Sequence, residues 1–146
     1  MSSVAAPTQI WQLPAKMMWD SDCGALPVLN AQDRLMGLIT DRDICMAAAT
    51  KNKPASDITV WETMSGKAYT CQPTDDVHTA LDIMKRERVR RLPVVDEDGM
   101  FQGIIAMNDF LLAAQEAKGR SLPAVSYEDV VHTMKAISAH RVLVGA

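Results

Sequence analysis

The chain has 146 residues, of which 48% are hydrophobic and 23% charged, and its net charge at pH 7 is -3. This composition excludes a disordered or fibrous chain, and the length suits one compact domain or two small halves that share a core. The weakly negative charge argues against general nucleic-acid binding, and no apolar run approaches the roughly 20 residues that span a bilayer.

Residues 1–55 are expected to form a strand, a helix, two strands and a second helix. The first strand would be confined to Val4–Ala6. Pro14 falls inside the helix that follows, where it should kink the helix or delay its start. Asn30–Asp33 is a turn without glycine between the next two strands, and Gly37–Asp43 leads from the second of these into the second helix.

A short linking helix is expected over Ser56–Met64, and a strand over Ala68–Cys71. Thr74 has the side chain of a helix N-cap. The helix that follows should have one apolar face, because apolar residues recur at i, i+4 and i+7. These residues are Val77, Leu81 and Met84.

The stretch Asp96–Gly99 separates two apolar runs, Leu92–Val95 and Met100–Ile105. An Asp-Gly pair between such runs is a strong hairpin signal. A helix of about Asp109–Ala117 would follow and end near Gly119, which completes a second strand, helix, strand, strand, helix order.

A further helix is predicted near the C-terminus. Ser126 and Asp129 have the spacing of a capping box, in which two side chains reciprocally bond the first free N–H groups of a helix. Its apolar face is expected to hold Val130, Met134 and Ile137.

The two similar element orders reflect an internal repeat. Residues 4–48 align without gaps to residues 70–114, an offset of 66 residues, with 11 identities in 45 positions. About 3 identities would be expected from residue frequencies. The chain is therefore predicted to be a duplicated α+β protein with four segments. These are 1–55 as the first copy, 56–67 as a link, 68–120 as the second copy and 121–146 as a C-terminal helix and tail.

Two pairs of motifs carry a family resemblance. GALPVL at 24–29 with GLITDRD at 37–43 is one pair, and RRLPVVD at 90–96 with GIIAMND at 103–109 is the other. Over about Val4 to Lys118 the chain resembles a tandem CBS-domain protein, or Bateman module, of the stand-alone bacterial type. The resemblance implies two strand-helix-strand-strand-helix repeats packed with pseudo-two-fold symmetry, followed by a C-terminal helix.

The same resemblance implies a cytoplasmic, non-catalytic regulatory module for energy sensing. It would bind AMP, ADP, ATP, NAD or S-adenosylmethionine in the cleft between repeats, and signal through a homodimer or an unidentified effector protein. The adenine nucleotide would be a regulatory ligand, with no required cofactor, no metal, no nucleic acid and no membrane partner. A dimeric interaction scaffold that binds no nucleotide is the alternative.

Thr40, Arg42 and Asp43 are the site candidates of the first copy. A helix start offers free N–H groups to a phosphate, and a carboxylate can accept hydrogen bonds from two vicinal hydroxyls. The resemblance assigns the ribose to Asp43, ribose or phosphate oxygens to Thr40, and places Arg42 within reach of a phosphate. Helix capping is the alternative explanation for Thr40, Asp41 and Asp43.

In the second copy Asp109 is retained, but Ala106 replaces the hydroxyl residue, which removes a hydrogen bond worth about 0.5–1.5 kcal/mol. The resemblance directs Arg90 and Arg91 to phosphates, and a solvated basic patch is the alternative. The remaining nucleotide-binding candidates are Ile39, Thr70, Cys71 and Pro93.

Catalysis is not expected. The chain has no G-x-S-x-G, P-loop or H-E-x-x-H motif. Cys23, Cys45 and Cys71 lie far apart and are predicted to be buried, reduced thiols. Trp19 is interpreted either as a core residue or as a contact in a homodimer.

Overall fold

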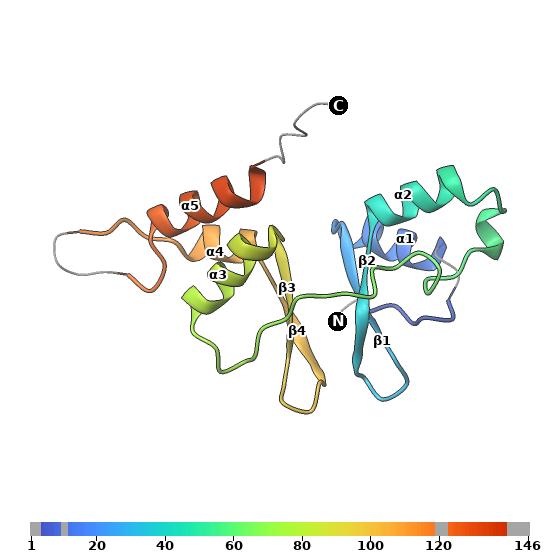
Figure 1. Cartoon of the computed structure of the whole chain (residues 1–146), viewed down its shortest axis with the longest axis horizontal. Coiled ribbons are helices and arrows are strands. Elements are labelled where there is room, and N and C mark those ends of the chain that lie inside the picture. The colour runs from blue at the N-terminus through green and yellow to red at the C-terminus, as the bar shows by residue number, and fades with distance from the viewer. Residues whose placement is uncertain (1–3, 10–11, 119–122, 140–146) are drawn as a thin grey trace, which may run out of the picture. The chain divides into compact units, whose positions relative to one another are not determined.

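The computed structural model describes residues 4–9, 12–118 and 123–139. The chain divides into two compact units. The first unit comprises Met1–Ala68 and Val95–Gly103, and the second comprises Tyr69–Val94 and Ile104–Ala146. The described residues form five α-helices, one 3-10 turn and two two-stranded sheets (Figure 1). The predicted α+β class is confirmed.

The first repeat contains α1 (Gln12–Asp20), β1 (Ala25–Leu29), β2 (Leu35–Thr40) and α2 (Asp41–Thr50). The second contains α3 (Val77–Glu87), β3 (Arg91–Val95), β4 (Phe101–Ala106) and α4 (Met107–Ala113), and α5 (Tyr127–Ser138) follows it. The strands β3 and β4 and the helix α4 each begin 66 residues after β1, β2 and α2. The offset predicted from the sequence is therefore also the offset between the element starts.

The sheet of the first repeat is antiparallel, and it places Leu26 opposite Ile39. These two side chains are 2% and 0% exposed and form part of the core of the first unit. The other buried members of that core come from α1, α2, β1 and the flanking segments. They are Ala5, Met18, Val28, Ile44 and Val60.

The strands predicted at Val4–Ala6 and Ala68–Cys71 are reduced to single parallel bridges. Ala5 pairs with Val28, and Cys71 pairs with Val94. Both bridges lie at equivalent positions of the two repeats, so the short N-terminal segment pairs with its sheet as its counterpart does.

Two predictions about helix starts were wrong. The N-cap of α3 is Asp76 and not Thr74, because the Asp76 carboxylate accepts a hydrogen bond from the backbone N–H of His78 at 2.8 Å. Pro14 does not delay α1, which begins at Gln12. Proline is tolerated in the first helical turn, where its missing N–H leaves no hydrogen bond unmade.

The linking helix predicted over Ser56–Met64 was also wrong. A 3-10 turn occupies Ala55–Asp57, and the chain then runs past Ile58 and Val60, which are both 0% exposed. Side chains two residues apart share a face in extended backbone but not in a helix, so burying both requires the extended form. The helix predicted at Asp109–Ala117 is α4, Met107–Ala113; Gly119 and the boundary at 120/121 lie outside the described residues.

The predicted C-terminal helix is confirmed as α5, with its capping box. The Ser126 hydroxyl donates to Asp129 Oδ2 at 2.7 Å and accepts from the Asp129 N–H at 3.1 Å. The hydrogen bond from Ser126 is the main reason why the pKa of Asp129 lies below its usual value. α5 packs against α3 and α4, and Val130 joins the core of the second unit. The other buried residues of this core are Cys71, Ala80, Leu81, Met84, Leu92, Met107, Phe110 and Val125.

The three cysteines are free. Cys71 is buried, Cys23 is half-buried and Cys45 is exposed on α2, so the prediction of burial was wrong for Cys45. Among the helices described, none combines the length and the apolar character that crossing a bilayer needs.

Candidate functional site

The turn from β2 into α2 brings together Thr40 and Asp43. Thr40 is the N-cap, and its hydroxyl accepts from the Asp43 N–H at 3.1 Å. In return, Asp43 Oδ2 accepts from the Thr40 N–H at 3.0 Å and from the Thr40 hydroxyl at 2.8 Å. This reciprocal box fixes the half-buried Asp43 carboxylate at the helix start. The capping role is therefore confirmed, and both bonds use the same carboxylate oxygen.

The neighbouring candidates Ile39 and Arg42 lie in different surroundings. Arg42 is exposed in the first turn of α2, and its N–H donates to the Asp41 carboxylate at 2.7 Å. Ile39 is fully buried in the core. A ligand could meet the guanidinium of Arg42, whereas it could meet only the main chain of Ile39.

The equivalent turn of the second repeat is simpler. Asp109 Oδ2 accepts from the Ala106 N–H at 2.7 Å, and Ala106 has no side-chain oxygen to return a bond to the helix start. Asp109 is exposed, unlike the half-buried Asp43. Its carboxylate has one fewer hydrogen-bond donor to hold it in place.

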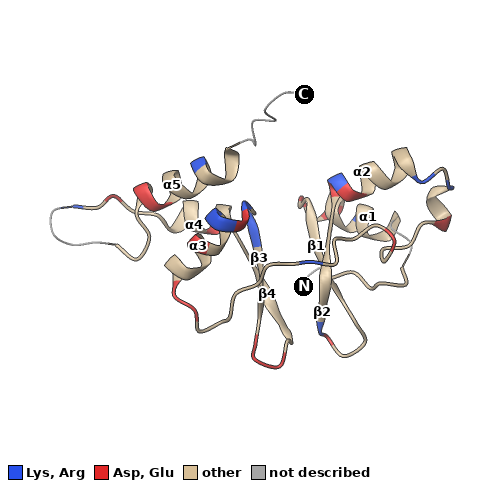
Figure 2. Cartoon of the chain, viewed as in Figure 1, with Lys and Arg blue, Asp and Glu red and all other residues tan. Residues whose placement is uncertain are grey.

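Two arginines lie at the same corner of the second unit. The N–H of Met107, the first residue of α4, donates to the carbonyl of Arg90 at 3.0 Å. Arg90 and Arg91 are exposed. Figure 2 shows this basic group where α3 ends and β3 begins. The fold therefore places two arginine positions next to the helix start that carries Asp109.

The remaining candidates of the second unit lie together along β3. The Cys71 N–H donates to the Pro93 carbonyl at 3.1 Å, and half-buried Thr70 precedes Cys71. Burial, and secondarily the negative charge of Asp75, raises the pKa of the Cys71 thiol. Cys71 is therefore a neutral packing residue, and the polar groups at this edge belong to the main chain and Thr70.

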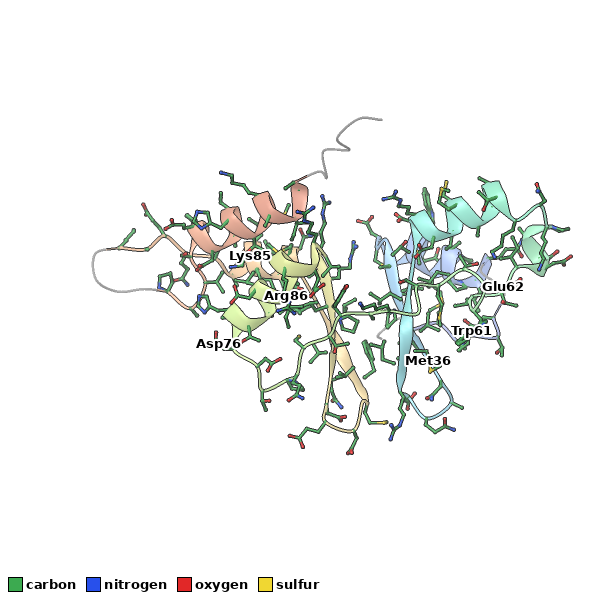
Figure 3. All side chains as sticks on the ribbon, in the orientation of Figure 1. Met36, Trp61, Glu62, Asp76, Lys85 and Arg86 are labelled. Atoms are coloured by element: carbon green, nitrogen blue, oxygen red, sulfur yellow. The ribbon has the colours of Figure 1, made fainter. Side chains whose placement is uncertain are left out.

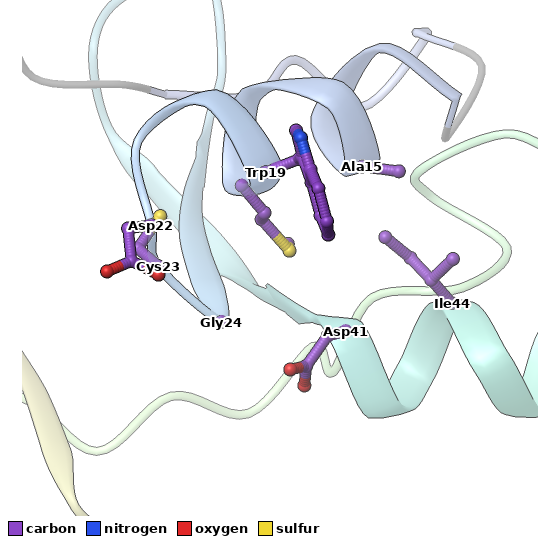
Figure 4. Close-up of a pocket in the computed structure, with 8 residues that line it drawn as sticks. Ala15, Trp19, Asp22, Cys23, Gly24, Asp41 and Ile44 are labelled. Atoms are coloured by element: carbon purple, nitrogen blue, oxygen red, sulfur yellow. The ribbon is translucent and has the colours of Figure 1, made fainter.

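A pocket of the first unit contains none of the candidates predicted from the sequence. Its volume is about 390 Å³, and it opens between α1, the turn after it and the start of α2 (Figure 4). Trp19 lies at its edge and is 87% exposed, so the interpretation of Trp19 as a core residue was wrong. The lining residues are Ala15, Met18, Trp19, Asp22, Cys23, Gly24, Asp41 and Ile44.

A signal for this pocket is present in the repeat alignment. Ala15 aligns with Leu81, and Ile44 aligns with Phe110. The smaller side chains in the first copy leave space that the larger ones fill in the second. Within the described part of the chain, no group of three or more His, Cys, Asp or Glu side chains is placed to hold a metal ion.

Comparison with known sequences gives a consistent result. The model of the CBS domain family matches residues 12–50 and 55–116. The CBS domain-containing protein YhcV of Bacillus subtilis is 29% identical over 134 residues, which cover 88% of this chain and 91% of YhcV. Several other curated relatives are longer, and the chain spans between 20% and 58% of their length.

Solved structures show the same architecture. The crystal structure of Hypoxic Response Protein I, with two coordinated zinc ions, has a TM-score of 0.69 and 26% identity, over 77% of this chain and 91% of that one. The CBS domain pair of protein MJ0100, in complex with 5-methylthioadenosine and S-adenosyl-L-methionine, has a TM-score of 0.66 and 25% identity. That match covers 77% of this chain and 87% of the other.

Proposed function

This chain belongs to the CBS-domain family, and from that premise we propose that it is a non-catalytic regulatory module that binds an adenosine-containing ligand. The candidate ligands are AMP, ADP, ATP, NAD and S-adenosylmethionine. The adenosine ligands of the MJ0100 domain pair support this ligand class.

The observation that carries the proposal is the position of Asp43. Its carboxylate is held by two hydrogen bonds from Thr40 at a helix start, and both bonds use Oδ2. Within the described residues, no protein group bonds the other oxygen, Oδ1. A carboxylate fixed in this way can accept the hydroxyls of a ribose. The first three N–H groups of α2 already donate to acceptors within the protein, so the helix start attracts an anion through the positive end of its dipole. Arg42 would then contact a phosphate.

In the second repeat, the proposed ligand contacts fall into two groups, one at the start of α4 and one along β3. Asp109 would accept from the ribose, Arg90 and Arg91 would bind phosphate, and Thr70, Cys71 and Pro93 would line the base. Ala106 has no hydroxyl to hold the Asp109 carboxylate in place. The affinity for a ligand at this site should therefore be lower by up to about tenfold.

The regulatory output would pass through a homodimer or an effector protein in the cytoplasm, with energy sensing as the role if the ligand is AMP, ADP or ATP. A switch of this kind requires that the ligand bind one state of the protein more tightly than another. The dissociation constant and the oligomeric state are therefore to be measured on the same samples.

The test is calorimetric titration with the five ligands, supported by thermal shift. A ligand at about 100 times its dissociation constant stabilises the folded state by ~2.7 kcal/mol, or roughly 5–10 °C at this length. Asp43→Asn should weaken binding about tenfold or more, because it removes an anionic acceptor of two hydroxyls. Asp41→Asn is the matched control, since Asp41 lies in the same helical turn and, among the bonds described, its carboxylate accepts only from the N–H of its neighbour Arg42.

Thr40→Ser keeps the hydroxyl that caps α2 and is available to the ligand, and should therefore leave both the cap and binding unchanged. If Asp109→Asn abolishes binding and Asp43→Asn does not, the working site belongs to the second repeat. If none of the five ligands binds the folded wild type, the dimeric scaffold replaces this proposal. Sedimentation velocity would then decide whether the scaffold is a dimer.

A further inference from the structure

The C-terminal helix α5 lies along α3 and has a polar contact with it at each end (Figure 1). Just after the end of α3, the guanidinium of Arg88 donates to the Ala139 carbonyl at 3.4 Å. At the start of α3, His78 Nε2 lies 3.6 Å from Asp129 Oδ2. An arginine stays protonated at every physiological pH, whereas the charge of a histidine changes within that range. The two ends of α5 are therefore held by contacts of different pH dependence.

The ring of His78 faces a carboxylate at both of its nitrogens. Nδ1 lies 3.0 Å from Asp76 Oδ1 on the same helix, and Nε2 faces Asp129 on α5. An ionised carboxylate only accepts hydrogen bonds. A neutral imidazole carries one N–H, so its other nitrogen would present a lone pair to a carboxylate, whereas an imidazolium donates at both nitrogens. Both contacts are therefore favourable only when the ring is protonated.

Both carboxylates are fixed by the helix starts to which they belong. Asp76, labelled in Figure 3, is the N-cap of α3, and its Oδ1 accepts from the backbone N–H of His78 at 2.8 Å. Asp129 Oδ2 accepts from the N–H and from the hydroxyl of Ser126 at 2.9 and 2.7 Å. These bonds do not involve the ring, so they hold both carboxylates in position whether or not the ring is protonated.

The two carboxylates keep their charge throughout the range in which histidines titrate. Hydrogen bonds from the backbone and then from the ring of His78 lower the pKa of Asp76, and the bond from the Ser126 hydroxyl is the main cause that lowers the pKa of Asp129. The ordinary pKa of an aspartate is already about 3.9, against about 6.5 for a histidine in a peptide. Between pH 5.5 and pH 7.5, a change of charge in this group of three therefore falls to the imidazole.

The other charged side chains on the adjoining turns have partners of their own. The Asp75 carboxylate accepts from a backbone N–H before α3, and Asp82 pairs with Lys85 one turn further along α3. On α5, Glu128 lies 3.7 Å from His132 Nε2. His132 is thus a second exposed histidine of this surface, but its carboxylate is on its own helix and does not join α5 to α3.

We propose that His78 is a pH-sensitive switch for the docking of α5, which joins the start of α5 to the start of α3 when the ring is protonated and releases it when the ring is neutral. The contact of Arg88 persists in both states, so release loosens the first turns of α5 and leaves its last turns in place. α5 covers a core that includes Leu81 and Phe110, which are 1% and 2% exposed. The proposal is independent of nucleotide binding.

The test is amide hydrogen exchange of the full chain without nucleotide at pH 5.5 and pH 7.5, followed by NMR and corrected for the intrinsic effect of pH on exchange. Protection of the amides of residues 130–133 should fall about two- to fivefold between the lower and the higher pH, the range of an exposed ion pair. Protection of residues 136–139, at the end of α5 held by Arg88, should stay the same.

Three variants assign the effect to one ring. His78→Gln is uncharged at both pH values and should show the lower protection at both. His78→Lys is positively charged at both and should show the higher protection at both. His132→Gln is the matched control on α5 and should behave as the wild type. The His78 side chain is 53% exposed, so these substitutions leave the core intact, and circular dichroism at both pH values verifies that the helices are retained.

Equal pH dependence in the wild type and in His78→Gln overturns the proposal. A wild type in which the protection of residues 130–133 does not change with pH also overturns it. A difference that disappears in His132→Gln and persists in His78→Gln would assign the effect to the other ring. A uniform loss of protection over all of α5 would show that the helix opens as a whole, which contradicts the persistent contact at its end.

Discussion

The two repeats have the same backbone plan but different surfaces at the corner where the first helix meets the first strand. The first repeat carries Asp20 and Asp22 there, followed by Gly24 and Ala25. Arg86, Arg88, Arg90 and Arg91 hold the equivalent positions of the second repeat. Duplication has kept the turn itself, because Asp22 and Arg88 share a left-handed conformation with φ of 49° and 56°. The backbone is therefore set by the repeat, and the side chains make one corner acidic and the other basic.

Other side chains around these corners also differ. At the end of α3, Lys85 pairs with Asp82 and Arg86 with Glu87, whereas Asp76 marks the start of that helix (Figure 3). The second repeat covers its helices with α5, and the first leaves a groove between them. The first repeat has the complete capping box and the second has only half of it. The two repeats therefore present different side chains at equivalent positions. Each difference can be tested by exchanging the residues at matched positions.

The largest effect on stability is expected in the second unit, on the surface of α3 and α4 against which α5 packs. Leu81→Ala introduces the residue of the first repeat into a site that is 1% exposed, and should lower the free energy of unfolding by about 2–5 kcal/mol. Ala15→Leu makes the reverse exchange in a half-buried, open pocket and should cost nothing. Urea denaturation of both variants checks this. Equal destabilisation by the two substitutions would contradict the view that the helices are covered in the second repeat and open in the first.

A smaller effect is expected at the paired glycines of β2 and β4. A Cβ on Gly37 would lie only 2.3 Å from the Ser65 carbonyl oxygen, where the linker pairs with Leu38. Gly103, its counterpart, has nothing within 4 Å of such an atom. Gly37→Ala should therefore destabilise by about 1–3 kcal/mol through overpacking, and Gly103→Ala should be neutral or slightly stabilising. Thermal unfolding of the two variants measures both effects. Equal melting temperatures for the two variants would contradict the prediction.

Exchanging the N-cap residues of α2 and α4 should change the free energy of unfolding by about 1 kcal/mol. Thr40→Ala removes the N-cap hydroxyl of α2 and should cost about that amount. Ala106→Thr supplies the missing hydroxyl to α4, whose N-cap backbone has φ -125° and ψ 162°, close to the -117° and 161° of Thr40. It should stabilise by a similar or smaller amount. Chemical denaturation of the two single variants measures both, and a destabilising Ala106→Thr would show that the second turn has lost the geometry of the first.

The smallest effect concerns the pH dependence that α5 adds to the second unit. The hydrogen bond from Ser126 holds the pKa of Asp129 below its ordinary value, so the carboxylate is more acidic when folded than when unfolded. Its stabilising contribution is present above the ordinary pKa of about 3.9, and is lost as the pH falls through the lower, folded pKa. The melting temperature of Asp129→Asn should therefore fall less between pH 6 and pH 3 than that of the wild type. An unchanged slope would exclude this carboxylate as a contributor.

The sequence was sufficient for the features that depend on local pattern or on self-similarity. The offset of 66 residues predicted the matched starts of β1 and β3, and the Ser126–Asp129 spacing predicted α5. The meeting of Thr40 and Asp43 also followed from spacing, because residues three apart at a helix start are within reach of one capping box. These features require only neighbours along the chain.

Features that depend on contacts between distant segments were decided by the tertiary structure. Burial of both Ile58 and Val60 keeps the chain extended between these two residues, and only a single turn follows at residues 60–64, where the local sequence favoured a helix. The close approach of Ser65 makes Gly37 necessary although the identical Gly103 is unconstrained. The pocket between α1 and α2 is open, whereas α5 packs on the corresponding helices of the second repeat, because helix packing depends on the shape and volume of both partners. Periodicity in a sequence identifies an apolar face, but only the folded chain determines what covers it.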